Sequence, residues 1–552
     1  MYPIFLNEIH VFNKILLKKS NIHKELYTYP SKWKADLVGH ASDCKRLAVT
    51  LEYECFEIPY SAHFCEGAAP FFSFSITFNF LFTDKVLGAS PLLLCVLSLQ
   101  VQPPNFVFIL TDDQDLVLRG MLPMTNVKNL IGKQGVTLAN SYVASPLCCP
   151  SRSSILTGQY VHNHGAINNS VSGQCSSVRW QKKTFAAHLH HNGYRTFFAG
   201  KYLNQYGMDE VGGVQHIPPG WDWWLGLKGN SRYYNYSLSV NGTHKKHGSD
   251  PNKDYLTNVI RERALEFLSQ SSFSKPFFMM LSVPAAHAPF TPEPKYSNNF
   301  TSLKALRTEN FNIKAGKSKH WLLRQGVQPL PDDVITKVDN VFRNRLRTLL
   351  TVDDMVYNVL QYLELKNQLE NTYVVFTSDN GYHLGQFSQP LDKREPYETD
   401  IRVPFLIRGP SIPAGKVIKF PTSNIDLAPT FLDLAGLQIP KYMDGISLKR
   451  TILVEHSGEG HLTNVGCEHI QSGMSGCNPD FACKCEDSWN NTYSCLRQIS
   501  DGENRLYCKW DDDEAFEELY DLDKDPWQLN NTASSFALPP SNTSGSPSIS
   551  LY

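Results

Sequence analysis

The segment from Cys148 to Gly158 combines residue types that could do chemistry, and it reads C-C-P-S-R-S-S-I-L-T-G. Arg152 follows Pro150 by two positions. If the segment is helical, Arg152 lies one turn from Cys148, where its guanidinium can stabilise negative charge. An ordinary alternative stays open from these residues alone: a disulfide-bonded turn in which Pro150 ends a strand and the serines cap a helix.

Two pairs of oxygen-donor side chains stand at the ends of apolar runs. Asp112 and Asp113 follow the first run, and Asp379 and Asn380 follow a later one, in T-S-D-N-G. Either pair alone has an ordinary explanation, because Asp-Asp often caps a helix and Asp-Asn-Gly is a common turn. Together, three carboxylates and one amide oxygen suit a hard cation such as Ca2+ or Mg2+ far better than zinc. The two pairs therefore predict a metal site.

Basic side chains in three further motifs could bind an anion. Lys201 lies in F-A-G-K-Y-L-N at the end of a predicted strand, Lys393 precedes Y-E and R-V-P, and His287 lies in V-P-A-A-H-A-P-F. Most lysines are only solvated surface residues, and a lone histidine between prolines is more often structural. Beside a reacting anion, however, a fixed cation can stabilise the charge of the transition state by roughly 3 kcal/mol.

Taken together, these motifs resemble those of the type I sulfatases, in which the first cysteine of C-x-P-S-R is oxidised during secretion to formylglycine. The resemblance implies that Cys148 becomes this aldehyde and that a formylglycine-generating enzyme acts on the chain during maturation. One hydroxyl of the hydrated aldehyde would attack the sulfur of a sulfate ester, and the other would expel sulfate as the aldehyde re-forms. Arg152 would stabilise the ionised hydroxyl.

The same resemblance assigns a role to each candidate residue. The implied catalytic residues are Cys148, Arg152, Lys201, His287 and Lys393. The residues implied to bind the substrate are Lys201, His287, His383 and Lys393. The implied calcium ligands are Asp112, Asp113, Cys148, Asp379 and Asn380. Many members carry a histidine two residues after the first clamp lysine, where this chain has Leu203. His383, in D-N-G-Y-H-L-G, is the candidate that replaces it.

Longer phrases indicate which sulfate ester is the substrate. Y-Y-N-Y-S-L-S-V-N-G, K-H-W-L-L-R-Q and T-S-D-N-G-Y-H-L-G-Q-F-S resemble family members that hydrolyse the 6-sulfate ester of N-acetylglucosamine units in heparan sulfate and keratan sulfate. This resemblance spans about 103–533. It implies a sulfated glycosaminoglycan as the substrate and the lysosome, reached through the secretory pathway, as the location. It leaves a homodimer as one option for the assembly.

Other functions stay open at this point. A phosphatase or phosphodiesterase on the same scaffold would use Ser or Thr as its nucleophile, so Cys148 argues against it. Another sulfate ester, or a glycosaminoglycan-binding glycoprotein without activity, remains as an alternative. A basic run at 314–324 and tryptophans at 221–224 could face a polysaccharide, although either could equally be a solvated face or part of the core.

The alternation of apolar strands with helix-like stretches predicts an α/β fold. Strands are expected at 105–110, 195–199, 276–283, 373–377 and 403–407, and helices at 257–268, 343–365 and 426–435. This pattern predicts a central, mostly parallel sheet flanked by helices, with the active site past the carboxyl ends of its strands. The resemblance implies the alkaline-phosphatase-like fold of the sulfatases. The catalytic domain is expected at 103–440, a smaller cysteine-rich α+β domain at 441–536, and a disordered tail at 537–552.

Composition and targeting signals complete the prediction. The net charge of -1 in 552 residues gives no global field to attract nucleic acid, and no apolar run is long enough for a stable membrane span. Seven Asn-x-Ser/Thr sequons and thirteen cysteines favour an oxidising secretory compartment. Six of the cysteines crowd into the stretch 467–508, where disulfides are expected instead of a zinc site because the spacings fit no C-x2-C pair, and Cys149 is expected to pair with Cys175. Residues 1–102 are expected to be an N-terminal extension with a candidate internal signal near 86–101. The interpretation is that the true start lies near residue 86, after an alternative or misassigned first exon.

Overall fold

The computed structural model describes residues 74–80, 95–446, 452–459, 474–476, 478–482, 484–500 and 503–533. Most of the predicted N-terminal extension, the tail at 537–552, and Cys467, Cys477 and Cys483 lie outside the described residues. Ahead of the catalytic region, β1 (Phe74–Phe80) and β2 (Cys95–Val101) form an antiparallel pair.

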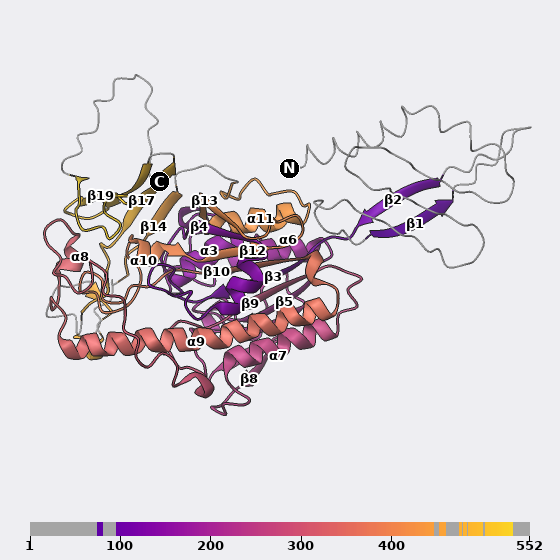
Figure 1. Cartoon of the computed structure of the whole chain (residues 1–552), viewed down its shortest axis with the longest axis horizontal. Helices are drawn as coiled ribbons and strands as arrows, with labels where there is room; N and C mark the ends of the chain where they lie inside the picture. Colours follow the sequence, from indigo (N-terminus) through magenta and orange to yellow (C-terminus); the bar gives the residue numbers. More distant parts are fainter. Residues whose placement is uncertain are drawn as a thin grey trace, which may run out of the picture. The chain divides into compact units, whose positions relative to one another are not determined.

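Five parallel strands form the centre of an eleven-stranded sheet (Figure 1). In their order across the sheet they are β10 (Thr372–Ser378), β3 (Asn105–Thr111), β9 (Phe277–Ser282), β5 (Arg195–Gly200) and β6 (Trp223–Leu227). β10, β3 and β9 are buried along their whole length, as expected for parallel strands covered on both faces. The predicted α/β fold is confirmed.

Antiparallel strands extend the sheet on both sides. Beyond β10 lie β12 (Phe405–Arg408) and β4 (Val136–Tyr142), and β4 also pairs with β11 (Arg402–Val403) and β13 (Lys416–Ser423). Beyond β6 lie β7 (Ser237–Val240) and β8 (Thr243–Lys246). The strand expected at 403–407 is divided into β11 and β12 because Pro404 has no N–H for the ladder.

Helices cover both faces of the sheet (Figure 1). Val107 and Ile109 of β3 pack in one core with α7 (Leu256–Ser269) and α9 (Asp332–Leu365). Phe106, Phe108 and Leu110 pack in another core with α3 (Cys148–Thr157), α6 (Phe185–His191) and α11 (Leu427–Leu434). Alternate residues of β3 therefore pack against the helices on opposite faces of the sheet. The helix expected at 343–365 begins earlier, at Asp332, directly after Pro331.

A second, antiparallel sheet follows the catalytic region. It consists of β14 (Ile452–His456), β17 (Tyr493–Ser500), β18 (Glu503–Trp510) and β19 (Glu517–Asp521). Cys495 and Cys508, paired in register on β17 and β18, form a disulfide. Tyr142 and Tyr397 of the catalytic region share one hydrophobic core with Trp510 of this sheet. The second sheet is therefore packed directly onto the region that carries the predicted site.

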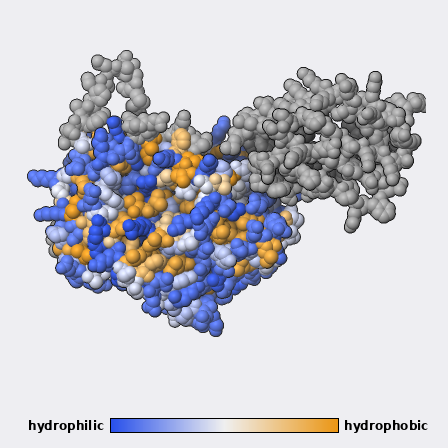
Figure 2. All heavy atoms as spheres, viewed as in Figure 1, coloured by the Kyte–Doolittle hydropathy of each residue, from blue (hydrophilic) through white to orange (hydrophobic). Residues whose placement is uncertain are grey.

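Figure 2 shows hydrophobic residues interspersed among hydrophilic ones on the face that it displays. Within the part of the chain that the structure describes, no helix combines the length and the apolar character needed to cross a bilayer.

Candidate active site

The predicted site residues meet at the carboxyl ends of the central strands. Asp112 follows β3, Asp379 follows β10, Lys201 follows β5, and His287 comes soon after β9. Because these strands are parallel neighbours, their ends lie along one edge of the sheet, and residues up to about 280 positions apart come into contact there.

Cys148 is the first residue of α3, and the whole helix is buried. Its Sγ lies 3.8 Å from Oδ1 of Asp112 and 3.9 Å from Oδ1 of Asp113. Burial raises the pKa of the Cys148 thiol to about 12, so the unmodified thiol stays protonated and is a poor nucleophile.

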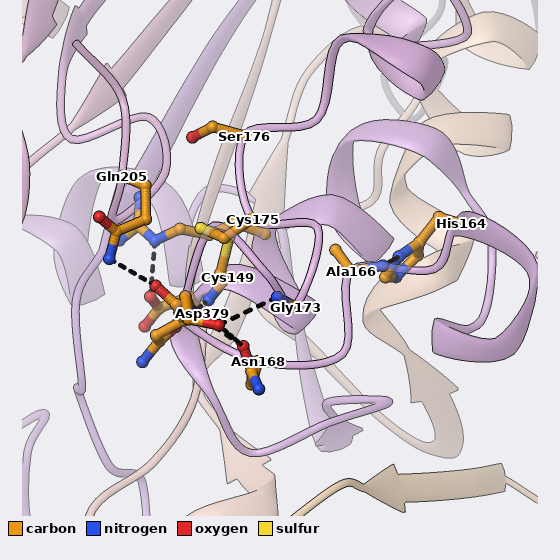
Figure 3. The surroundings of a disulfide bond; sticks show 12 residues. Cys149, His164, Ala166, Asn168, Gly173, Cys175, Ser176, Gln205 and Asp379 are labelled. Atoms are coloured by element: carbon orange, nitrogen blue, oxygen red, sulfur yellow. Dashed lines mark hydrogen bonds and ion pairs between the residues drawn. A yellow bond between two sulfur atoms is a disulfide. The ribbon is translucent and has the colours of Figure 1, made fainter. Parts of the chain in front are cut away.

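A disulfide joins Cys149 to Cys175, as predicted (Figure 3), and the neighbouring Cys148 forms no disulfide with a residue whose side chain the structure describes. The alternative of a simple disulfide-bonded turn therefore accounts for Cys149 and not for Cys148.

Arg152 lies one helical turn after Cys148, as expected, and it contacts residues at four strand ends. Its Nε donates to Oδ2 of Asp379 over 2.7 Å. Its Nη1 donates to the Lys201 carbonyl and to Oγ of Ser282, both over 2.8 Å, and its Nη2 lies 3.4 Å from Asp112. The guanidinium thus fixes the relative positions of β5, β9 and β10 around the helix that carries Cys148.

Two lysines neutralise the adjacent aspartates. Lys201 Nζ donates to both oxygens of Asp112, over 2.8 and 3.0 Å, and Lys393 Nζ donates to Oδ2 of Asp113 over 2.8 Å. Burial by itself would raise the pKa of Asp112, but Lys201, together with Arg152 and Lys393, outweighs it and holds that pKa well below its usual value. Both aspartates are therefore ionised.

These residues fit a divalent metal ion. Oxygen, sulfur and nitrogen atoms of Asp112, Asp113, Cys148 and His287 lie within 4.8 Å of one another. Oδ1 of Asn380 is buried and accepts no hydrogen bond from the residues that the structure describes; it lies beside Asp113, to which its Nδ2 donates over 2.7 Å. A buried acceptor with no donor and a cluster of carboxylates are what a hard cation requires.

Asp379 has a double role in this cluster. Its Oδ1 accepts the backbone N–H groups of Asp113 and Asn380, over 3.0 and 2.9 Å, and its Oδ2 accepts from Arg152. Burial raises the pKa of Asp379 to about 7, against the opposing effect of Arg152. A bound cation would keep this carboxylate ionised.

His287 faces the same carboxylates. Its Nδ1 lies 2.8 Å from the carbonyl of Ala288, which places the ring proton there and leaves Nε2 toward Asp113, 3.7 Å away. Burial lowers the pKa of His287 to about 4, against the opposing pull of Asp112 and Asp113. The hydroxyl of Tyr233 donates to the His287 carbonyl over 2.9 Å and helps to hold the ring in place.

His383 is not brought into direct contact with this cluster by any bond that the structure shows. Its Nδ1 lies 3.0 Å from Oδ2 of the buried Asp400, and its ring stacks on Tyr382, whose own ring lies 5.7 Å from Nζ of Lys393. Leu203 is fully buried in the hydrophobic core. The proposal that His383 replaces a histidine at 203 stays a prediction.

Several residues at the site carried no sequence signal. Ser231 donates to Asp112. Arg345, from the middle of α9, donates to the Asp113 carbonyl over 2.6 Å and to Asp115 over 2.9 Å, and it lies over the ring of Tyr382. Asp115, in T-D-D-Q-D, could have been flagged as a further acid, but its partner comes from a helix 230 positions later.

Comparisons with known proteins identify the family of the chain. The Sulfatase family model matches residues 104–437. The N-acetylglucosamine-6-sulfatase of Capra hircus is 50% identical over 451 residues, covering 78% of this chain and 80% of that protein. The Homo sapiens N-acetylglucosamine-6-sulfatase is 49% identical, covering 78% of this chain and 81% of that protein. The solved structure of a complex with the substrate D-glucosamine-2-N,6-O-disulfate has a TM-score of 0.64 at 23% identity, covering 79% of this chain and 95% of that chain.

The fold and the site together define a hydrolase with an alkaline-phosphatase-like sheet. This chain belongs to the sulfatase family, whose members generally use formylglycine and a divalent metal. It is a sulfuric ester hydrolase, and the resemblance inferred from its motifs is confirmed.

Proposed function

We propose that this protein hydrolyses the 6-sulfate ester of N-acetylglucosamine units in heparan sulfate and keratan sulfate. The observation that carries the proposal is the free Cys148 between two aspartates that are each paired with a lysine. The identity of about half of the aligned residues to relatives named N-acetylglucosamine-6-sulfatase supports the substrate.

Cys148 is the proposed site of conversion to formylglycine by the formylglycine-generating enzyme. The hydrated aldehyde supplies a hydroxyl nucleophile, which a thiol with a pKa of about 12 does not provide. Arg152, one turn away and hydrogen-bonded to Asp379, supplies positive charge beside that hydroxyl.

Lys201 and Lys393 are proposed to bind the oxygens of the sulfate group. Each is buried and already held by an aspartate, so neither needs to reorganise when charge builds up in the transition state. His287 is proposed to carry a proton at Nε2 to the oxygen of the leaving alcohol. A bound sulfate ester adds negative charge beside the ring and raises the pKa of His287, so that the proton is available.

The proposed metal is calcium, with Asp112, Asp113, Asp379, Asn380 and position 148 as ligands. The carboxylate and amide oxygens favour a hard cation over zinc. When bound, the ion would polarise a sulfate oxygen and orient the ester.

The lysosome, reached through the secretory pathway, is the proposed location. The disulfides Cys149–Cys175 and Cys495–Cys508 require an oxidising compartment during folding, which this route provides. The proposed organisation keeps the catalytic domain at 103–440 and the smaller domain at 441–536. A homodimer is tested by light scattering of the purified protein.

The decisive experiment combines two measurements on protein secreted by eukaryotic cells. The mass of the peptide that spans Cys148 reports formylglycine, and sulfate release is compared between saccharides that end in 6-sulfated N-acetylglucosamine and matched saccharides sulfated elsewhere. Cys148→Ala is the control. An aldehyde with selective release of the 6-sulfate supports the proposal. An aldehyde with release from another position indicates a different ester, and saccharide binding with an intact thiol indicates a binding protein.

A further inference from the structure

Glu459, which follows β14 in the second sheet, connects two parts of the active site with its two carboxylate oxygens. Oε1 accepts the backbone N–H of Asn169 over 3.1 Å. Oε2 accepts from Nη2 of Arg394 over 3.0 Å. We call Asn169, Glu459 and Arg394 the Glu459 bridge. Its two arms span 290 and 65 positions of the sequence.

One arm of the bridge leads to the helix that carries the nucleophile position. Oδ1 of Asn169 accepts the backbone N–H of Cys149 over 2.9 Å, in the first turn of α3 and directly beside Cys148. The Asn169 carbonyl accepts from Gln205 over 2.7 Å, and Cys149 is held by its disulfide to Cys175 (Figure 3). Asn169 is therefore fixed relative to the start of α3.

The other arm leads to the second lysine of the site. Arg394 directly follows Lys393, and both residues that flank Lys393 have a positive φ, 152° at Asp392 and 97° at Arg394. Non-glycine residues adopt such angles at a cost, and they persist where surrounding contacts over-determine them. Arg394 has these contacts: its guanidinium meets Asp392, Glu459 and Asp487, and its carbonyl accepts from the hydroxyl of Tyr493 over 2.7 Å.

The bridge is charged and sheltered from solvent. Burial alone would raise the pKa of Glu459, but Arg394 outweighs it and lowers that pKa, so the carboxylate is ionised. The backbone N–H of Glu459 donates to Oδ2 of Asp487 over 2.8 Å, and this hydrogen bond fixes the backbone that carries the Glu459 side chain. Hydrogen bonds between ionised partners are stronger and more directional than neutral ones.

We infer that Glu459 is a positioning residue, which sets the distance between Lys393 and the start of α3. The second sheet thereby controls the geometry of catalysis without contributing a group that touches the substrate. The inference rests on the proposed function, in which Lys393 binds the sulfate and position 148 carries the nucleophile.

The test is Glu459→Gln, with Glu455→Gln as the matched control. The glutamine keeps an oxygen for Asn169 but turns an NH2 group toward Arg394, so only the second arm breaks. Glu455 lies four residues earlier on β14 and pairs with His162, whose side chain is 43% exposed. We expect Glu459→Gln to lower kcat/KM about 10- to 100-fold, because a displacement of about 1 Å near the chemistry has an effect of that size. Glu455→Gln should match the wild type.

Three further readouts separate positioning from a merely structural role. The fraction of Cys148 converted to formylglycine should be unchanged, and the Tm should stay near that of Glu455→Gln. In a Lys393→Ala background, Glu459→Gln should have little further effect, because the two changes act on one group. If Glu459→Gln does not fold, Glu459→Asp replaces it in the test, because the shorter side chain keeps the charge but weakens both contacts. Glu459→Asp must then have a wild-type Tm and a kcat/KM between that of the wild type and that of Lys393→Ala.

Binding of inorganic sulfate, measured by calorimetry on the intact protein, distinguishes failure of this inference from failure of the proposed function. Weak sulfate binding by Lys393→Ala and by Glu459→Gln supports both. Weak binding by Lys393→Ala with normal binding and normal kcat/KM in Glu459→Gln overturns the positioning role alone. Normal sulfate binding by Lys393→Ala overturns the proposed sulfate contact. The positioning role is also overturned if Glu459→Gln lowers kcat/KM by the same factor in the wild-type background and in the Lys393→Ala background.

Discussion

Lys201 and Asp112 form an ion pair in which both side chains are completely buried. Nζ of Lys201 lies 2.8 and 3.0 Å from the two carboxylate oxygens, so the lysine is oriented before any substrate arrives. A buried charge without its partner is strongly unfavourable, and each residue therefore depends on the other.

Lys201→Ala should lower both activity and stability. Loss of one fixed cation at the reacting group removes about 3 kcal/mol of transition-state stabilisation, which is on the order of a 100-fold fall in kcat/KM. The unpaired Asp112 should lower the free energy of unfolding by about 3 kcal/mol. Kinetic assays and urea unfolding test these effects. Lys245→Ala, on the exposed strand β8, is the control and should change neither quantity.

Removal of the proposed calcium ion should inactivate the protein and destabilise it. A ligand that binds only the folded state at 100 times its Kd stabilises that state by about 2.7 kcal/mol. We therefore expect the Tm to fall when a chelator is added and to recover with Ca2+. Asn380→Ala, which removes the unpaired buried oxygen, should reduce the calcium-dependent shift in Tm. A shift restored by Zn2+ and not by Ca2+ would contradict the proposed ligand set.

His164 should make the folded state less stable as the pH falls. Burial lowers its pKa from 6.5 to about 3, and its Nε2 lies 3.0 Å from Oγ of Ser154 in α3. The unfolded chain binds the proton first, so the contribution of the neutral ring is complete above pH 6.5 and is lost as the pH falls toward 3. Between pH 6.5 and 5 the loss is about 2 kcal/mol. His164→Gln should lack this part of the pH dependence in urea unfolding, whereas His162→Gln, at a half-exposed site, should keep it.

Loss of the disulfide between Cys149 and Cys175 should destabilise the protein by about 3 kcal/mol, because a loop of this length gains that much conformational entropy when unfolded. The double variant Cys149→Ser/Cys175→Ser tests this by urea unfolding. The other double variant, Cys495→Ser/Cys508→Ser, opens a shorter loop and should lose slightly less. Conversion of Cys148 to formylglycine should be equal in both, since Cys148 takes part in neither bond.

The sequence could predict that many of the site residues lie close together, because they belong to short motifs at the ends of predicted strands. Asp112 and Asp379 each follow a strand that is apolar and buried along its length, so their meeting at one edge follows from a parallel sheet. For single residues outside such motifs, the sequence did not predict whether the side chain is buried or faces a ligand. Lys319, in the basic run, is buried against the rings of Phe387 and Tyr397 instead of facing a polysaccharide.

The tryptophans show the same limit. Trp221 and Trp224 pack in the hydrophobic core with Phe198, so the core explanation holds for both. Their spacing is compatible with a sugar-binding surface or with a core strand, and only the packing of the neighbouring elements distinguishes these alternatives.

The sequence by itself predicted the α/β class and the pairing of Cys149 with Cys175, both of which the structure confirms, and it proposed the metal ligands and the nucleophile from their motifs. These features depend on local periodicity and on contiguous motifs. Only the tertiary structure decided that Glu459 lies between Arg394 and the start of α3, and that Arg345 of α9 reaches Asp113. The physical reason is that such contacts join residues tens to hundreds of positions apart, and their geometry is fixed by how the layers pack and not by the chain around either partner.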